Sequence, residues 1–180
     1  ADESLKKDRE IVMAAVKDWG YALEFADKSL KKDREIVMAA GKQDGYALDW
    51  ADKSLLKDRE VVLAAVKQRG YALRFADKSL KKDREVVLAA VKQDGFVLRY
   101  ADKSLQQDKE IFMVARKKVL AAIKEDGTAL KDASKSLKKD KEIVLAAIKT
   151  YYANYGSALG YADKSLRKDR EIVMASVKQD

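Results

Sequence analysis

The sequence predicts an all-α protein, an α-solenoid built from helix-turn-helix repeats of about 25 residues. A Ser-Leu-x-x-Asp motif recurs along the whole chain, and its aspartates are 25, 25, 25, 25, 32 and 29 residues apart. One glycine marks the middle of each unit, and the chain has no proline that would interrupt a helix. The recurring aspartates are Asp8, Asp33, Asp58, Asp83, Asp108, Asp140 and Asp169, and the glycines are Gly20, Gly45, Gly70, Gly95, Gly127 and Gly156.

Residues 8–18 show the features expected of the first helix in a unit, the A helix. Asp8 is a good N-cap, because its carboxylate can accept hydrogen bonds from the free N–H groups of the first turn. The apolar residues at positions 11–16 cover most of the helix circumference, so the helix should be buried on more than one side. Gly20 is expected to end the helix in the left-handed conformation.

A second helix, the B helix, is predicted to follow from Tyr21 toward Leu30. Its aromatic residues recur at a spacing that favours a place in the core over a role in stacking on nucleic-acid bases. These residues are Phe25, Trp50, Phe75 and Tyr100. Helices this short barely form alone, so the units have to stack on one another. We expect seven A helices and six complete B helices in a single array over residues 1–180.

Two consecutive units, within residues 108–156, are longer than the others. Their A helices, which begin at Asp108 and Asp140, carry seven and four extra residues. These lengths are close to two turns and one turn, so the apolar stripes stay in phase and the helices should overhang by about 10 Å and 6 Å. Gly41 stands where several units have valine, and we expect it to leave a void and to weaken its helix.

The composition argues against catalysis and leaves binding open. The chain has no cysteine and no histidine, which excludes thiol nucleophiles, imidazole bases and the usual zinc ligands. The carboxylates are interpreted as helix caps, so no catalytic, metal or cofactor site is predicted and an enzyme is not expected. The net charge of +8 permits binding to nucleic acid or to an anionic membrane, although charges of both signs alternate as on solvated helix faces.

The sequence leaves the cellular location open. No apolar stretch is long enough to span a bilayer, and no targeting signal is visible. The chain begins at Ala1 within a recognisable unit, so we expect a processed protein or a piece of a longer one.

The two lengthened helices supply the candidate partner-binding site, because a specific partner needs a surface that is not repeated. Tyrosine and arginine are favoured interface anchors. The basic residues are expected to face solvent or an acidic partner, whereas the tyrosines fit equally well as core between the two helices. The candidate residues are Arg116, Lys117, Lys118, Tyr151, Tyr152, Tyr155 and Tyr161.

The unit pattern DREIVMAAVKQDGYAL, which residues 8–23 and the later units repeat with small changes, resembles the repeat family named domain of unknown function 4116. The resemblance covers nearly the whole chain and departs from the family pattern at the lengthened helices. It implies tandem helical repeats and supplies no established activity or catalytic residue. We therefore expect a non-catalytic scaffold or a protein-binding subunit of a larger assembly, with electrostatic binding of nucleic acid or an anionic membrane as the alternative.

Overall fold

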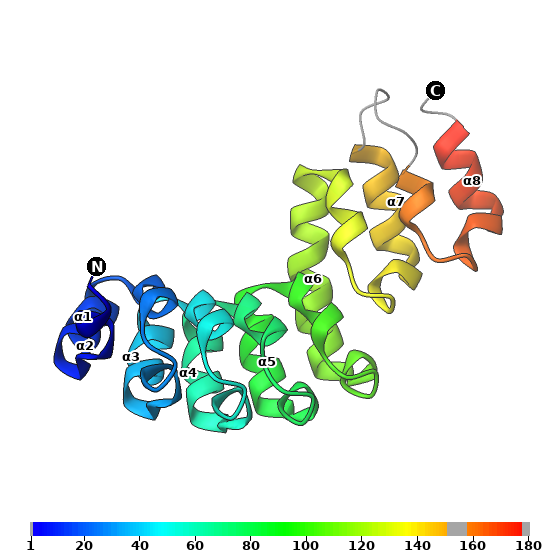
Figure 1. Ribbon diagram of the computed structural model, residues 1–180. Helices are drawn as coiled ribbons and strands as arrows, with labels where there is room; N and C mark the ends of the chain where they lie inside the picture. The colour runs from blue at the N-terminus through cyan, green and yellow to red at the C-terminus, as the bar shows by residue number, and fades with distance from the viewer. Residues whose placement is uncertain (1, 151–157, 178–180) are drawn as a thin grey trace.

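The computed structural model describes residues 2–150 and 158–177, and it shows the predicted all-α repeat solenoid (Figure 1). Within these residues every regular element is helical, and no strand is present. The α-helices are α1 (Glu3–Lys7), α2 (Arg9–Asp18), α3 (Arg34–Gln43), α4 (Arg59–Gln68), α5 (Arg84–Gln93), α6 (Lys109–Glu125), α7 (Lys141–Thr150) and α8 (Arg170–Val177). Helices α2 to α8 are the A helices of the units. None of the described helices is both long and apolar enough to cross a membrane.

The recurring aspartates are helix caps, as predicted. The Asp33 Oδ1 atom accepts hydrogen bonds from the backbone N–H groups of Glu35 at 2.9 Å and Ile36 at 3.2 Å. The same cap precedes α2, α4 and α5, and each cap is followed by an acidic residue in the first turn. These carboxylates compensate the positive end of the helix, which fixes where each A helix begins.

The second half of each unit is helical, but it consists of two 3-10 segments rather than one α-helix. The first segments are η1 (Gly20–Phe25), η3 (Gly45–Trp50), η5 (Gly70–Arg74), η7 (Gly95–Tyr100), η9 (Gly127–Asp132) and η11 (Ala158–Tyr161). The second segments are η2 (Leu30–Lys32), η4 (Leu55–Lys57), η6 (Leu80–Lys82), η8 (Leu105–Gln107), η10 (Leu137–Lys139) and η12 (Leu166–Lys168).

An aspartate between the two segments explains the break. Asp27 Oδ1 accepts hydrogen bonds from the N–H and the hydroxyl of Ser29 at 2.9 and 2.7 Å, which forms a local turn. The N–H of Asp27 donates to the carbonyl of Lys6 in the preceding unit at 2.9 Å. Because that N–H bonds across units, it is not available to a continuous helix. The break therefore also joins neighbouring units.

The glycine at the centre of each unit is required by a close approach and not by a left-handed backbone. Gly20, Gly45, Gly70 and Gly95 do not have φ in the left-handed region, so that expectation for Gly20 is wrong. A Cβ atom built on Gly45 would lie 2.6 Å from the carbonyl oxygen of Ala65 in the next A helix. The Gly45 N–H also donates to Gln68 Oε1 at 2.7 Å. Glycine thus lets adjacent units come into backbone contact.

Gly41 does not leave the expected void. A Cβ atom at this position would lie 3.3 Å from the Cβ of Ala65 and 3.7 Å from Cδ2 of Leu48. The first distance is already tighter than an ordinary van der Waals contact, so α3 and α4 pack closely where Gly41 stands.

Three of the four aromatic residues predicted as core, Trp50, Phe75 and Tyr100, are partly buried and pack against the edge of the core, whereas Phe25 does not. Phe25 is 54% exposed, and Trp50, Phe75 and Tyr100 are half-buried. Edge-to-face contacts link consecutive units, such as the pair Tyr71 and Tyr100 with ring centroids 5.3 Å apart. The fully buried core consists of aliphatic residues from the A helices and from the 3-10 segments, such as Leu48.

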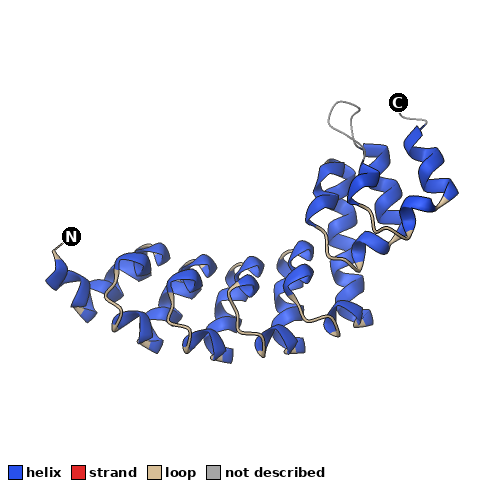
Figure 2. Ribbon diagram, turned by 45° about the vertical axis from the view of Figure 1, so that its right-hand side comes forward, coloured by secondary structure: helices blue, strands red, loops and turns tan. Residues whose placement is uncertain are grey.

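The array changes direction at α6. Figures 1 and 2 show the units of α2 to α5 in one row, from which a second row with α7 and α8 departs steeply, and α6 belongs to both. Helix α6 has 17 residues where α3, α4 and α5 have 10. The described part of α7 has 10 residues, and the four-residue lengthening expected of that helix falls at 151–156, which lies outside the described residues.

Candidate binding groove along α6

Ion pairs between consecutive A helices form a regular ladder along the protein. Arg9 Nε lies 2.8 Å from Asp33 Oδ2, and its Nη2 atom pairs with Glu35. A basic residue at the helix start therefore binds both the cap and the first-turn glutamate of the next helix. The ladder pairs are Arg9–Asp33, Arg34–Asp58, Arg59–Asp83, Arg84–Asp108, Arg116–Asp140 and Lys141–Asp169.

The ladder shifts by seven residues within α6. Arg84 binds Asp108 and Glu110 at the start of α6, so the first turn of this helix closes the row that precedes it. The regular ladder position in α6 is Lys109, yet the residue that reaches Asp140 is Arg116, at 2.6 Å. The first two turns of α6 thus belong to the first row, and the part from Arg116 onward begins the second row.

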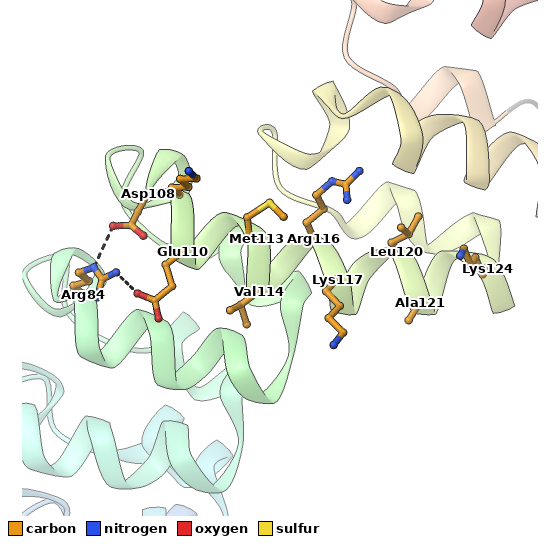
Figure 3. Close-up of a pocket in the computed structure, with 11 residues that line it drawn as sticks. Arg84, Asp108, Glu110, Met113, Val114, Arg116, Lys117, Leu120, Ala121 and Lys124 are labelled. Carbon is orange, nitrogen blue, oxygen red and sulfur yellow. Dashed lines mark hydrogen bonds and ion pairs between the residues drawn. The ribbon is translucent and has the colours of Figure 1, made fainter.

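This shift leaves part of α6 without the neighbour that other A helices have. A groove of about 1040 Å³ runs along the helix, and Figure 3 shows the side chains that line it. Met113 is 52% exposed, and Val114 and Leu120 are half-buried. The lining residues are Arg84, Asp108, Lys109, Glu110, Met113, Val114, Arg116, Lys117, Leu120, Ala121 and Lys124. The groove therefore has an apolar floor and a charged rim.

The carboxylates at the rim, Asp108 and Glu110, already form ion pairs with Arg84. Backbone hydrogen bonding from Ile111 and the Arg84 guanidinium lower the pKa of Asp108, so this cap stays ionised and occupied. Lys109, Lys117 and Lys124 have no ion pair with any residue that the structure describes. The groove thus presents three free ammonium groups beside its apolar residues.

A second hollow of about 640 Å³ extends the groove toward α7. Leu120 and Lys124 line both hollows, and the second one adds Leu145 and Lys149 from α7. An apolar surface with a basic edge therefore continues from α6 onto the second row.

The predicted basic residues have three different roles. Arg116 does not face an acidic partner as a free cation: its hydrogen bonds to Asp140 and then Glu142 raise its pKa, and only 22% of its side chain is exposed. Lys117 lines the groove and is exposed. Lys118 is exposed but lies outside the groove. Its Cβ lies 3.0 Å from the position that a Cβ atom added to Gly95 would occupy.

Tyr161, the one predicted tyrosine among the described residues, does not line the groove. Tyr161 lies on η11 and is 39% exposed. Tyr151, Tyr152 and Tyr155 lie outside the described residues.

The apolar residues of the groove were missed in the sequence, although a signal for them exists. Met113 and Val114 recur seven residues later as Leu120 and Ala121, and Lys117 recurs as Lys124. A repeat of seven residues places these pairs on one face of the helix. Alignment of α6 with both neighbouring units would have revealed two overlapping A-helix patterns.

A more basic hollow of about 710 Å³ lies among η7 to η10. Its six cations face one carboxylate, Asp132, which Arg99 binds at 2.8 Å. Ser134 replaces the aspartate found in other units, and Gln107 stands at the position where most units have lysine. The cations are Arg99, Lys103, Lys131, Lys135, Lys138 and Lys139. Across residues 2–150 and 158–177 no cluster of carboxylates is placed to hold a metal ion.

Stacked helical units joined by recurring caps, turns and ion pairs define the class of protein as a tandem helical-repeat protein. The chain belongs to the family described as Domain of unknown function (DUF4116). Matches to the family cover residues 1–31, 8–56, 33–81, 58–106, 83–115, 116–155 and 151–180. The boundary between 115 and 116 coincides with the ladder shift in α6. No curated protein and no solved structure matches the chain.

Proposed function

We propose that this chain is a non-catalytic helical-repeat scaffold that binds a protein partner along α6, as a subunit of a larger assembly. The groove of about 1040 Å³ carries this proposal, because it arises where the repeat is interrupted. In the regular units the charged residues of the ladder form the same ion pairs from one unit to the next. Those units therefore present a similar surface several times. A specific partner requires a surface that occurs once.

Photo-crosslinking from the groove tests this function. Benzoylphenylalanine is placed at Leu120 in the full chain, and a matched variant carries it at Met38, the equivalent position of α3. Both variants are expressed in the organism from which the chain comes, irradiated, and analysed by mass spectrometry. We expect one dominant adduct from position 120 and none from position 38. Equal adducts from the two positions, or none from position 120, would contradict a partner site in this groove.

Electrostatic binding of nucleic acid or an anionic membrane is the second candidate function. The basic hollow among η7 to η10 and the net charge of +8 favour it. Two of its cations are already engaged, because Arg99 binds Asp132 and Lys138 Nζ donates to the carbonyl of Lys131 at 2.6 Å. Burial also lowers the pKa of Lys138. Retention on heparin, on duplex DNA and on anionic vesicles between 50 and 200 mM salt would show this mode as a steep loss with salt.

A further inference from the structure

We infer that the groove along α6 binds an acidic amphipathic α-helix. This inference rests on the proposed function and adds the chemistry of the partner. Three features of the groove lead to it: the spacing of its apolar residues, their exposure, and the charge of its rim.

The apolar residues of the groove are spaced for contact with another helix. Met113 and Leu120 are seven residues apart, as are Lys117 and Lys124. Seven residues of helix advance about 10 Å, which is two turns, so side chains two turns apart on a partner helix can meet Met113 and Leu120. Helices that pack in a groove use side chains at positions i, i+3, i+4 and i+7. The groove thus has the period of a helix–helix contact.

The exposure of Met113 distinguishes α6 from the regular A helices. Met113 is 52% exposed, whereas the equivalent Met38, Leu63 and Leu88 are half-buried. An exposed methionine beside Val114 and Leu120 leaves apolar area that a partner can remove from water. Methionine adapts its shape to the surface that covers it.

The charge of the rim selects an acidic partner. Lys109, Lys117 and Lys124 have no ion pair among the described residues, whereas Asp108 and Glu110 are both bound by Arg84. Glutamates flanking the apolar face of a partner helix would meet these lysines, and lysines there would be repelled. A second copy of this chain is a poor fit, because its regular A helices carry lysine in their last turn. Single-stranded nucleic acid fits poorly because no aromatic residue lines the groove.

Binding of a synthetic peptide tests the inference directly. The probe is a fluorescein-labelled peptide of 18 residues with leucine at alternate spacings of three and four residues and glutamate on both flanks. Two control peptides have the same composition in scrambled order, or glutamine in place of every glutamate. Fluorescence anisotropy at 150 mM salt should show binding of the probe at least tenfold tighter than that of either control, a difference of about 1.4 kcal/mol.

Charge reversal locates the site. The double variant Lys117→Glu with Lys124→Glu should weaken probe binding by at least tenfold. The matched control, Lys42→Glu with Lys67→Glu, changes the net charge equally on α3 and α4 and should bind as the original protein does. Leu120→Gln, which conserves side-chain size, should also weaken binding. Circular dichroism spectra establish that each variant is folded before its affinity is compared.

Three results would overturn the inference. Equal binding of the scrambled peptide would show simple electrostatic adhesion. Equal loss in the control variant would show that the site is not the groove. Concentration-dependent dimers in sedimentation velocity that Leu120→Gln abolishes would identify a second copy as the occupant. If the peptide fails to bind but crosslinks still form at position 120, the scaffold function stands with a different partner; if both fail, both proposals fall.

Discussion

Replacing Gly45 by alanine should destabilise the protein strongly. The substitution tests the close contact that sets the distance between units. The new Cβ would lie 2.6 Å from the carbonyl oxygen of Ala65 and 3.0 Å from the Cβ of Arg69. The first of these atoms belongs to the backbone of α4 and cannot rotate away, so the two units must separate. Overpacking of this kind costs about 1–3 kcal/mol.

The same separation weakens a hydrogen bond across the interface. The Gly45 N–H donates to Gln68 Oε1 at 2.7 Å, and such a bond contributes about 1 kcal/mol. The total loss is therefore about 2–4 kcal/mol, which for a chain of this size lowers Tm by roughly 4–16 °C. Thermal unfolding followed by circular dichroism at 222 nm measures this shift.

Two further variants separate close approach from backbone conformation. Gly160→Ala introduces a Cβ with nothing within 4 Å and should change stability by less than about 0.5 kcal/mol. Gly45→Asn would be better tolerated than Gly45→Ala if the position were left-handed, because asparagine enters that region more readily. The close contact predicts the opposite order. A Gly45→Ala protein as stable as the original would refute the reasoning.

Three other predictions concern α3, α6 and the caps. Gly41→Ala should be more stable than Gly41→Val in urea unfolding. Alanine gains about 1 kcal/mol of helix propensity over glycine, whereas the additional methyl groups of valine would press on Ala65. The reverse order of stability would show that there is spare room at this position. Arg116→Ala should lower stability by about 1–2 kcal/mol, more than Arg34→Ala, because its side chain is 22% exposed against 48% for Arg34; equal melting temperatures would contradict this. Finally, the hydrogen bond from Arg34 is the largest cause that holds the pKa of Asp58 below its usual range. Stability should therefore be constant from pH 8 to 5, where a chain without histidine has few groups to titrate. It should fall below about pH 4 as Asp58 and the caps Asp33 and Asp83, whose pKa values are also lowered, protonate. Melting curves across this range that peak at pH 3 would argue against the caps.

The repeat intervals were sufficient to predict the solenoid and the aspartate caps, because a cap depends on local sequence alone. The two-part structure of the second half-unit depends on Asp27, whose N–H bonds to Lys6 in another unit. The role of Gly45 likewise depends on Ala65 of the next unit. Contacts between units cannot be read from one unit, and for that reason these features were predicted incompletely.

The site predicted from the sequence overlaps only in part with the groove proposed from the structure. The lengthening of α6 was visible as seven extra residues, but the sequence was interpreted as an overhang of one helix. The ladder shows instead that Arg116 restarts the repeat within α6. This arginine, which was expected to bind a partner, forms an ion pair with Asp140 in the next unit. The apolar residues of the groove, the exposed Met113 and the half-buried Leu120, became apparent only when the neighbours of α6 were placed.

Deletion of residues 116–122 tests most directly whether the interruption of the repeat makes the binding site. The deletion joins Ala115 to Ile123 and restores the spacing of 11 residues from Lys109 to Gly127 that Arg84 and Gly95 have. Lys109 would then take the ladder position opposite Asp140. We predict a folded and continuous solenoid, with a cooperative unfolding transition, that no longer binds the acidic helical peptide. A folded deletion variant that binds the peptide with unchanged affinity would contradict the account.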